Sequence, residues 1–132
     1  MCLDIDEKRT KRVRRTLKEH GGKSIMWKVV RMGFVNSDHS ILYDQDYKKG
    51  CVAKSNRCYL EMNSVEEAFD QIDRGIHVFT NKPKAKEYLA RQKRVPFNRG
   101  AYLKIIPVTV SEKDFVAAGK VYDAVFMQVY VN

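Results

Sequence analysis

Lysine and arginine side chains are the residues whose type and spacing most clearly favour a chemical role in this sequence. Residues 82–104 hold eight Lys/Arg and one acid, a net charge of +7, and residues 1–23 carry +4. The segments 24–81 and 105–132 carry −1 each, so the whole excess of +9 lies in two short stretches. Such clustering favours a polyanionic or acidic partner. A basic surface that is only solvated is the alternative.

If the partner is a nucleic acid, its phosphates should contact basic residues of both stretches. The predicted contacts are Arg12, Arg14, Arg15, Lys82, Lys84, Lys86, Arg91, Lys93, Arg94 and Arg99. Phe97 and Tyr102 interleave with the second group and could stack on unpaired bases. No known nucleic-acid-binding signature is present, so binding should be mainly electrostatic and should weaken steeply as salt rises.

Other kinds of site have little support in the sequence. The histidines His20, His39 and His77 are scattered, and Cys51 and Cys58 are spaced more widely than in a zinc knuckle. We read His77 as a partly buried strand residue and the two cysteines as small, partly buried ones. We expect no metal site, no cofactor and no membrane-spanning segment, and we expect a cytoplasmic protein with reduced thiols.

The elements that must position the basic residues follow from capping and periodicity. A strand over Ile76–Phe79 leads to Thr80 or Asn81 as a cap, and then to a helix from about Lys82 to Arg94 whose buried stripe centres on Ala85. We predict a further helix over 4–20, ended by Gly21-Gly22. Strands are predicted over 24–31, 40–43, 58–60, 101–110 and 121–131. Pro107 should mark an edge or a bulge in the fourth of these. A short helix is predicted from Asn63 or Ser64 to Phe69.

Together these elements predict a single α+β domain, residues 1–132, with a mainly antiparallel sheet. Residues 1–23 form a basic helical arm, and residues 24–132 form the α+β core with one basic helix packed on the sheet. The polar first helix is either an arm for phosphate contacts or a solvated helix that covers a sheet edge.

One segment combines a glycine-led strand with a helix that carries alanine and tyrosine: Gly75-Ile76-x-Val78-Phe79 is followed by Ala85 and Tyr88. It resembles the glycine–isoleucine strand and the alanine- and tyrosine-bearing helix of ADP-ribosyltransferases of the poly-ADP-ribose-polymerase type. The resemblance implies that Tyr88 stacks on the nicotinamide of NAD, that Asp123 stands where the family has its catalytic glutamate, and that Arg31 replaces the first-strand arginine or histidine. An NAD-dependent transferase is therefore one alternative.

Three segments belong together: Ser55-Asn56-Arg57, the strand and helix that begin at Gly75, and the closing segment Asp114 to Phe126. In these segments the chain resembles small phage and prophage α+β proteins. The resemblance implies a protein that binds host machinery, including defence ribonucleoproteins that it could inhibit. We therefore expect a binding protein rather than an enzyme, with a nucleic acid or a host nucleic-acid-containing complex as partner. A structural or oligomer-forming protein, joined through an exposed final strand, is a further alternative.

Overall fold

The computed structural model describes residues 2–32, 37–40, 46–55, 58–61, 71–96, 102–120 and 122–132. Within these ranges the structure contains two α-helices, α1 (Glu7–Glu19) and α2 (Lys82–Lys93), and a short 3-10 helix, η2 (Glu112–Asp114). The strands are β1 (Cys2–Asp4), β2 (Lys23–Met32), β3 (Ser37–Ser40), β4 (Asp46–Lys48), β5 (Val52–Lys54), β6 (Cys58–Glu61), β7 (Gln71–Arg74), β8 (Ile76–Phe79), β9 (Leu103–Ser111), β10 (Phe115–Ala118), β11 (Asp123–Phe126) and β12 (Gln128–Val131). Among the described residues no helix is both long and apolar enough to cross a membrane.

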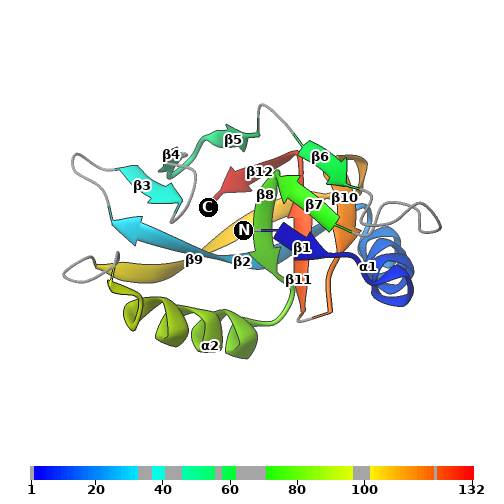
Figure 1. Cartoon of the computed structure of the whole chain (residues 1–132). Coiled ribbons are helices and arrows are strands. Elements are labelled where there is room, and N and C mark those ends of the chain that lie inside the picture. Colours follow the sequence, from blue (N-terminus) through cyan, green and yellow to red (C-terminus); the bar gives the residue numbers. More distant parts are fainter. Residues whose placement is uncertain are drawn as a thin grey trace.

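In the described part of the chain the strands form one large sheet and one small sheet, and every pairing between them is antiparallel (Figure 1). The large sheet has the order β10-β11-β8-β2-β9-β12-β5, with β3 paired to β2 and β4 paired to β3. The small sheet has the order β1-β7-β6. The predicted α+β fold with an antiparallel sheet is confirmed.

The pairing of β2 with β9 is the centre of the large sheet. Nine residue pairs join the two strands in register, from Lys23↔Ser111 to Arg31↔Leu103. Because β9 also pairs with β12, and because its register with β2 continues without a shift through Trp27↔Pro107, the prediction that Pro107 marks an edge strand or a bulge is wrong. The Pro107 carbonyl accepts a hydrogen bond from the Asn132 amide at 3.4 Å, so the proline nitrogen faces the end of the chain, where a missing N–H is tolerated.

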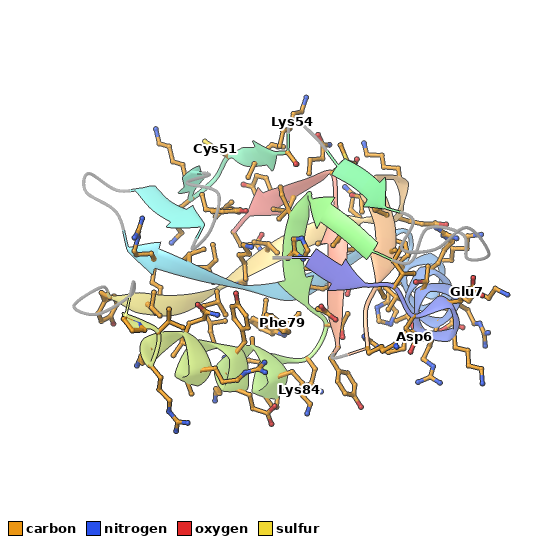
Figure 2. The ribbon with its side chains drawn as sticks, in the orientation of Figure 1. Asp6, Glu7, Cys51, Lys54, Phe79 and Lys84 are labelled. Carbon is orange, nitrogen blue, oxygen red and sulfur yellow. The ribbon has the colours of Figure 1, made fainter. Side chains whose placement is uncertain are left out.

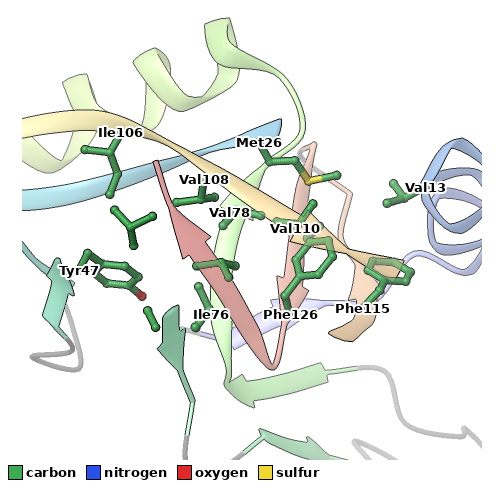
Figure 3. Packing of buried hydrophobic residues seen from close by; sticks show 14 of the residues in the cluster. Val13, Met26, Tyr47, Ile76, Val78, Ile106, Val108, Val110, Phe115 and Phe126 are labelled. Carbon is green, nitrogen blue, oxygen red and sulfur yellow. The ribbon is translucent and has the colours of Figure 1, made fainter. Parts of the chain in front are cut away.

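The main hydrophobic core lies on one face of the large sheet, and α1 packs against one end of it (Figure 3). Val13 and Leu17 of α1 are buried against it, at 7% and 0% exposure. Fully buried Phe126 packs on Phe115 with ring centroids 5.4 Å apart. Even a helix as polar as α1 is therefore anchored by two apolar side chains one turn apart.

A second, smaller core lies between the other face of the sheet and α2. Ala85 and Tyr88 of α2 pack there against Val29, Phe79 and Leu103. The rings of Tyr88 and Phe79 are 5.2 Å apart, and Figure 2 shows Phe79 between the sheet and α2. The buried stripe predicted for this helix is confirmed. Strand β2 contributes to both cores, as expected of a central strand, except at Ile25, which is 55% exposed.

Several predicted boundaries were wrong. The first helix begins at Glu7 rather than at residue 4, because residues 2–4 pair with β7 and the Asp6 carboxylate caps the helix through the Arg9 amide at 3.1 Å. Its end is as predicted: Gly21 and Gly22 have φ of +73° and +84°, and the Gly22 amide donates to Leu17.

The predicted final strand over 121–131 is in fact two strands. Strand β11 pairs with β8 and β10, whereas β12 pairs with β9 and β5. The strand structure is interrupted at Met127, which lies between them. Both strands have neighbours on each side, so neither supplies the exposed edge on which an oligomer-forming role was based. Of the predicted strand at 40–43, Ser40 is the last residue of β3, and residues 41–43 lie outside the described residues. The predicted helix over 63–69 lies outside the described residues.

One lysine enters the main core from β2. The Lys28 ammonium donates to the His77 carbonyl of β8 at 2.8 Å and lies 5.6 Å from the ring centre of Tyr47. Within the described residues Trp27↔Phe79 is the one registered pair between β2 and β8. The Lys28 side chain therefore supplies a donor to β8 where the backbone pairing stops. Burial lowers the pKa of Lys28 to about 8 and raises the pKa of Tyr47. His77 itself is buried, in agreement with its reading as a strand residue.

Candidate nucleic-acid interface

Helix α1 presents a basic face to solvent because its apolar residues occupy the opposite side. Arg12 and Arg15 are exposed, as are Lys8 and Lys11 one turn before them. Arg14 is exposed too, and its guanidinium lies over the ring of Phe115 at 5.3 Å. All three predicted arginines of this helix are therefore accessible to a partner.

Helix α2 carries its basic residues on both flanks of the buried stripe. Asn81 caps the helix by accepting a hydrogen bond from the Lys84 amide at 3.3 Å, and Pro83 occupies the first turn. Lys82 lies over the Trp27 ring at 5.0 Å, on the flank that Lys86 and Lys93 share by helical spacing.

The other flank of α2 carries Lys84 and Arg91. Lys84 pairs with Glu87 at 3.3 Å, and the Arg91 guanidinium lies 5.9 Å from the Tyr88 ring centre. Arg94, which ends the helix, is exposed, whereas Arg99 and Phe97 lie outside the described residues. Tyr102, the other predicted stacking residue, is 65% exposed.

The first turns of the two helices meet at Tyr122. The Arg9 guanidinium lies 4.8 Å from the Tyr122 ring centre and the Lys84 ammonium lies 5.5 Å from it. Arg9 also donates to the Thr80 hydroxyl at 3.2 Å and to the Gly119 carbonyl. Figure 1 shows α1 at one end of the molecule and α2 along one side, with their first turns toward the loop after β10. We call Arg9, Thr80, Lys84 and Tyr122 the helix junction.

Tyr122 has an unusual backbone conformation at this junction. Its φ is +58°, and it is the one residue other than glycine with positive φ in the described ranges. A bulky side chain in this region costs about 1–3 kcal/mol. The Thr80 amide and hydroxyl both donate to the Tyr122 carbonyl, at 2.8 and 3.1 Å, and hold this conformation. The result is a ring that is 45% exposed beside two cations.

Arg9 was not among the predicted site residues. Burial lowers its pKa, while the charges of Asp123 and Asp6 act to raise it. Its contacts lie 71 to 113 residues further along the chain, at Thr80, Gly119 and Tyr122. Its one sequence signal is its place in the first turn of a basic helix.

The residues of the transferase alternative are not brought together. Asp123 pairs with Phe79, and Phe79 pairs with Trp27 of β2. Arg31 lies four residues further along β2, which is about 13 Å from Trp27 at ordinary strand spacing. Tyr88 is 9% exposed and packs on Phe79 in the smaller core. Burial raises the pKa of Tyr88, and Arg91 acts to lower it. The Tyr88 ring is therefore used for packing in the smaller core of this structure.

The metal and thiol candidates can be placed only in part. Among the residues that the structure describes, no group of three or more His, Cys, Asp or Glu could hold a metal ion. Cys51 is a free, exposed thiol, so its reading as a partly buried residue is wrong. It follows the turn between β4 and β5, where its amide donates to the Lys48 carbonyl.

Comparisons with known proteins add no functional information. No protein-family model, no curated protein and no solved structure matches this chain. The function must therefore be argued from the basic helices and from the surfaces that the fold places beside them.

Proposed function

We propose that this protein binds a nucleic acid, or a host complex that contains one, through the basic faces of α1 and α2. The observation that carries the proposal is the helix junction. It joins the two positively charged segments of the sequence, which are separated by about sixty residues of slightly negative net charge. A polyanion that crosses the junction contacts both segments at once.

The chemistry of the junction suits a phosphate backbone. Exposed Lys and Arg side chains neutralise phosphates and release condensed counterions, which supplies most of the affinity in binding without sequence preference. The junction also offers an exposed tyrosine beside cations, and this combination tolerates many base types. Inhibition of a host defence ribonucleoprotein is the biological outcome that such binding would support, because the phosphates of its RNA are the complementary charge.

The proposal is tested by salt-dependent binding of RNA and DNA oligonucleotides. The double variant Arg91→Glu/Arg94→Glu lowers the net charge of the whole protein from +9 to +5, and both changes lie at the exposed C-terminal end of α2. The matched control is Lys48→Glu/Lys49→Glu, which makes the same change in net charge at the exposed end of β4 and in the turn after it. Circular dichroism checks that both variants fold.

We expect the α2 variant to bind at least ten-fold more weakly, and its salt slope to fall by about 0.9 for each lost phosphate contact. The control should keep most of the affinity. Equal losses in the two variants would mean that only net charge matters and that α2 is not the interface. Absence of binding by the wild-type protein at low salt would refute the proposal.

A further inference from the structure

Part of the large sheet is covered by neither helix. Cross-strand pairing places Ile25, Thr109, Tyr130 and Val52 in one row on a single face, because Thr109 pairs with both Ile25 and Tyr130, and Tyr130 pairs with Val52. Ile25 is 55% exposed, Tyr130 44% and Val52 53%. Their strand neighbours Met26, Val108 and Val129 point to the other face and form the main core. We call this row the open face.

The open face has a basic border. The next row along the same strands holds Lys23 opposite Ser111 and Gln128 opposite Lys54, all on the open side by strand alternation. A hollow of about 270 Å³ lies at this border, and Lys23, Ser111, Lys113, Gln128 and Tyr130 line it together with one acid, Asp114. The border is therefore rich in ammonium groups around an apolar and aromatic centre.

The opposite border of the open face reaches α2. Trp27 pairs with Pro107 in the adjoining row, on the same side of the sheet, and the Lys82 ammonium lies over its ring at 5.0 Å. Lys82 belongs to the flank of α2 that Lys86 and Lys93 share. The open face is thus continuous with the basic surface to which the proposed function assigns phosphate binding.

We propose that the open face binds unpaired bases of a single-stranded nucleic acid, an inference that rests on the proposed function and names the form of its ligand. The four strands span about 14 Å at ordinary strand spacing. An antiparallel sheet of this width has room for two or three splayed bases. Tyr130 supplies a ring for stacking, Ile25 and Val52 supply apolar contact, and the lysines on both borders contact the phosphates.

The charge and size of the face favour this ligand over the other occupants. A second copy of the chain would bring two lysine-bordered faces together, and three exposed apolar side chains fall far short of the roughly 800 Å² per partner that a stable interface buries. A duplex keeps its bases stacked inside, so it would leave Tyr130 without a stacking partner.

The test compares single-stranded and duplex oligonucleotides of the same sequence. Trp27 is the one tryptophan of the chain and borders the open face, so its fluorescence reports base contact there. Tyr130→Ala removes the ring from an exposed position, and Tyr130→Phe keeps it. We expect Tyr130→Ala to weaken single-strand binding about ten-fold and to reduce the fluorescence quench, with duplex binding unchanged and Tyr130→Phe close to wild type.

Each other outcome has a distinct meaning. If Tyr130→Ala leaves single-strand affinity unchanged while Arg91→Glu/Arg94→Glu lowers it, the inference about the open face is overturned and the proposed function stands. If neither form of nucleic acid binds the wild-type protein, both are overturned. A dimer seen by light scattering in the wild type and lost in Tyr130→Ala would assign the open face to a second copy of the chain and would also overturn the inference.

Discussion

Lys28 should make the stability of the protein rise as the pH becomes alkaline. Its pKa is about 8 in the fold, against an ordinary value of 10.5, because its ammonium is buried. Between these two values the unfolded chain binds more protons than the folded one, so the free energy of unfolding increases with pH. The full difference corresponds to about 3 kcal/mol, of which about 2.5 kcal/mol should be regained between pH 7 and pH 10.

The assay is urea denaturation at pH 7, 8, 9 and 10 for the wild type and for Lys28→Met. Methionine keeps much of the length without the charge, so the variant should lack the gain. The difference in unfolding free energy between the two proteins should shift by about 2.5 kcal/mol in favour of the wild type over this range. Measurements stop at pH 10 because buried Tyr47, whose pKa is raised, favours the unfolded chain at higher pH.

A matched control removes a lysine from the surface. Lys86 is exposed on α2, and Lys86→Met should give a curve parallel to that of the wild type, since an exposed ammonium is hydrated in both states. The reasoning fails if Lys28→Met is also parallel to wild type within about 0.5 kcal/mol. At pH 7 alone the variant is uninformative, because relief of the buried charge is offset by loss of the donor to the His77 carbonyl.

Two further predictions concern α2. Asn81→Ala removes the side-chain acceptor for the Lys84 amide and should lower the free energy of unfolding by about 1 kcal/mol, measured by urea denaturation; an unchanged midpoint would contradict the cap. Tyr88→Ala should cost about 3–5 kcal/mol because the ring packs in the smaller core, and calorimetry should show no saturable NAD binding to the wild type. Saturable binding that Tyr88→Ala abolishes would instead favour the transferase alternative.

The strand Ile76–Phe79 and the helix after it could be predicted because local signals agree there. A β-branched and aromatic run is followed by Asn81, which caps, and by Pro83, which suits a first turn. The interruption between β11 and β12 at Met127 has no such local signal, because the two-residue periodicity typical of a strand continues through residues 121–131. It is imposed by tertiary hydrogen bonds: the Met127 amide donates to Asp114, and the Met127 carbonyl accepts from Ser55.

The candidate site was predicted in its charges but not in its assembly. Clusters of Lys and Arg are visible in the sequence, and helical spacing placed Lys82 and Lys84 on opposite flanks of α2. That Arg9 would meet Lys84 across Tyr122 depends on the pairing of β8 with β11 and on the positive φ of Tyr122. The open face likewise depends on strand order, which no local pattern encodes.

The central pairing of β2 with β9 has a consequence for how the chain folds. It joins residues 23–31 to residues 103–111, so about seventy residues must be closed into a loop before the middle of the sheet exists. Folding dominated by such distant contacts is slow, and the edge of β2 that pairs with β9 stays unpaired meanwhile. The net charge of +9 then also protects against aggregation, because partly folded copies with unpaired strands repel one another.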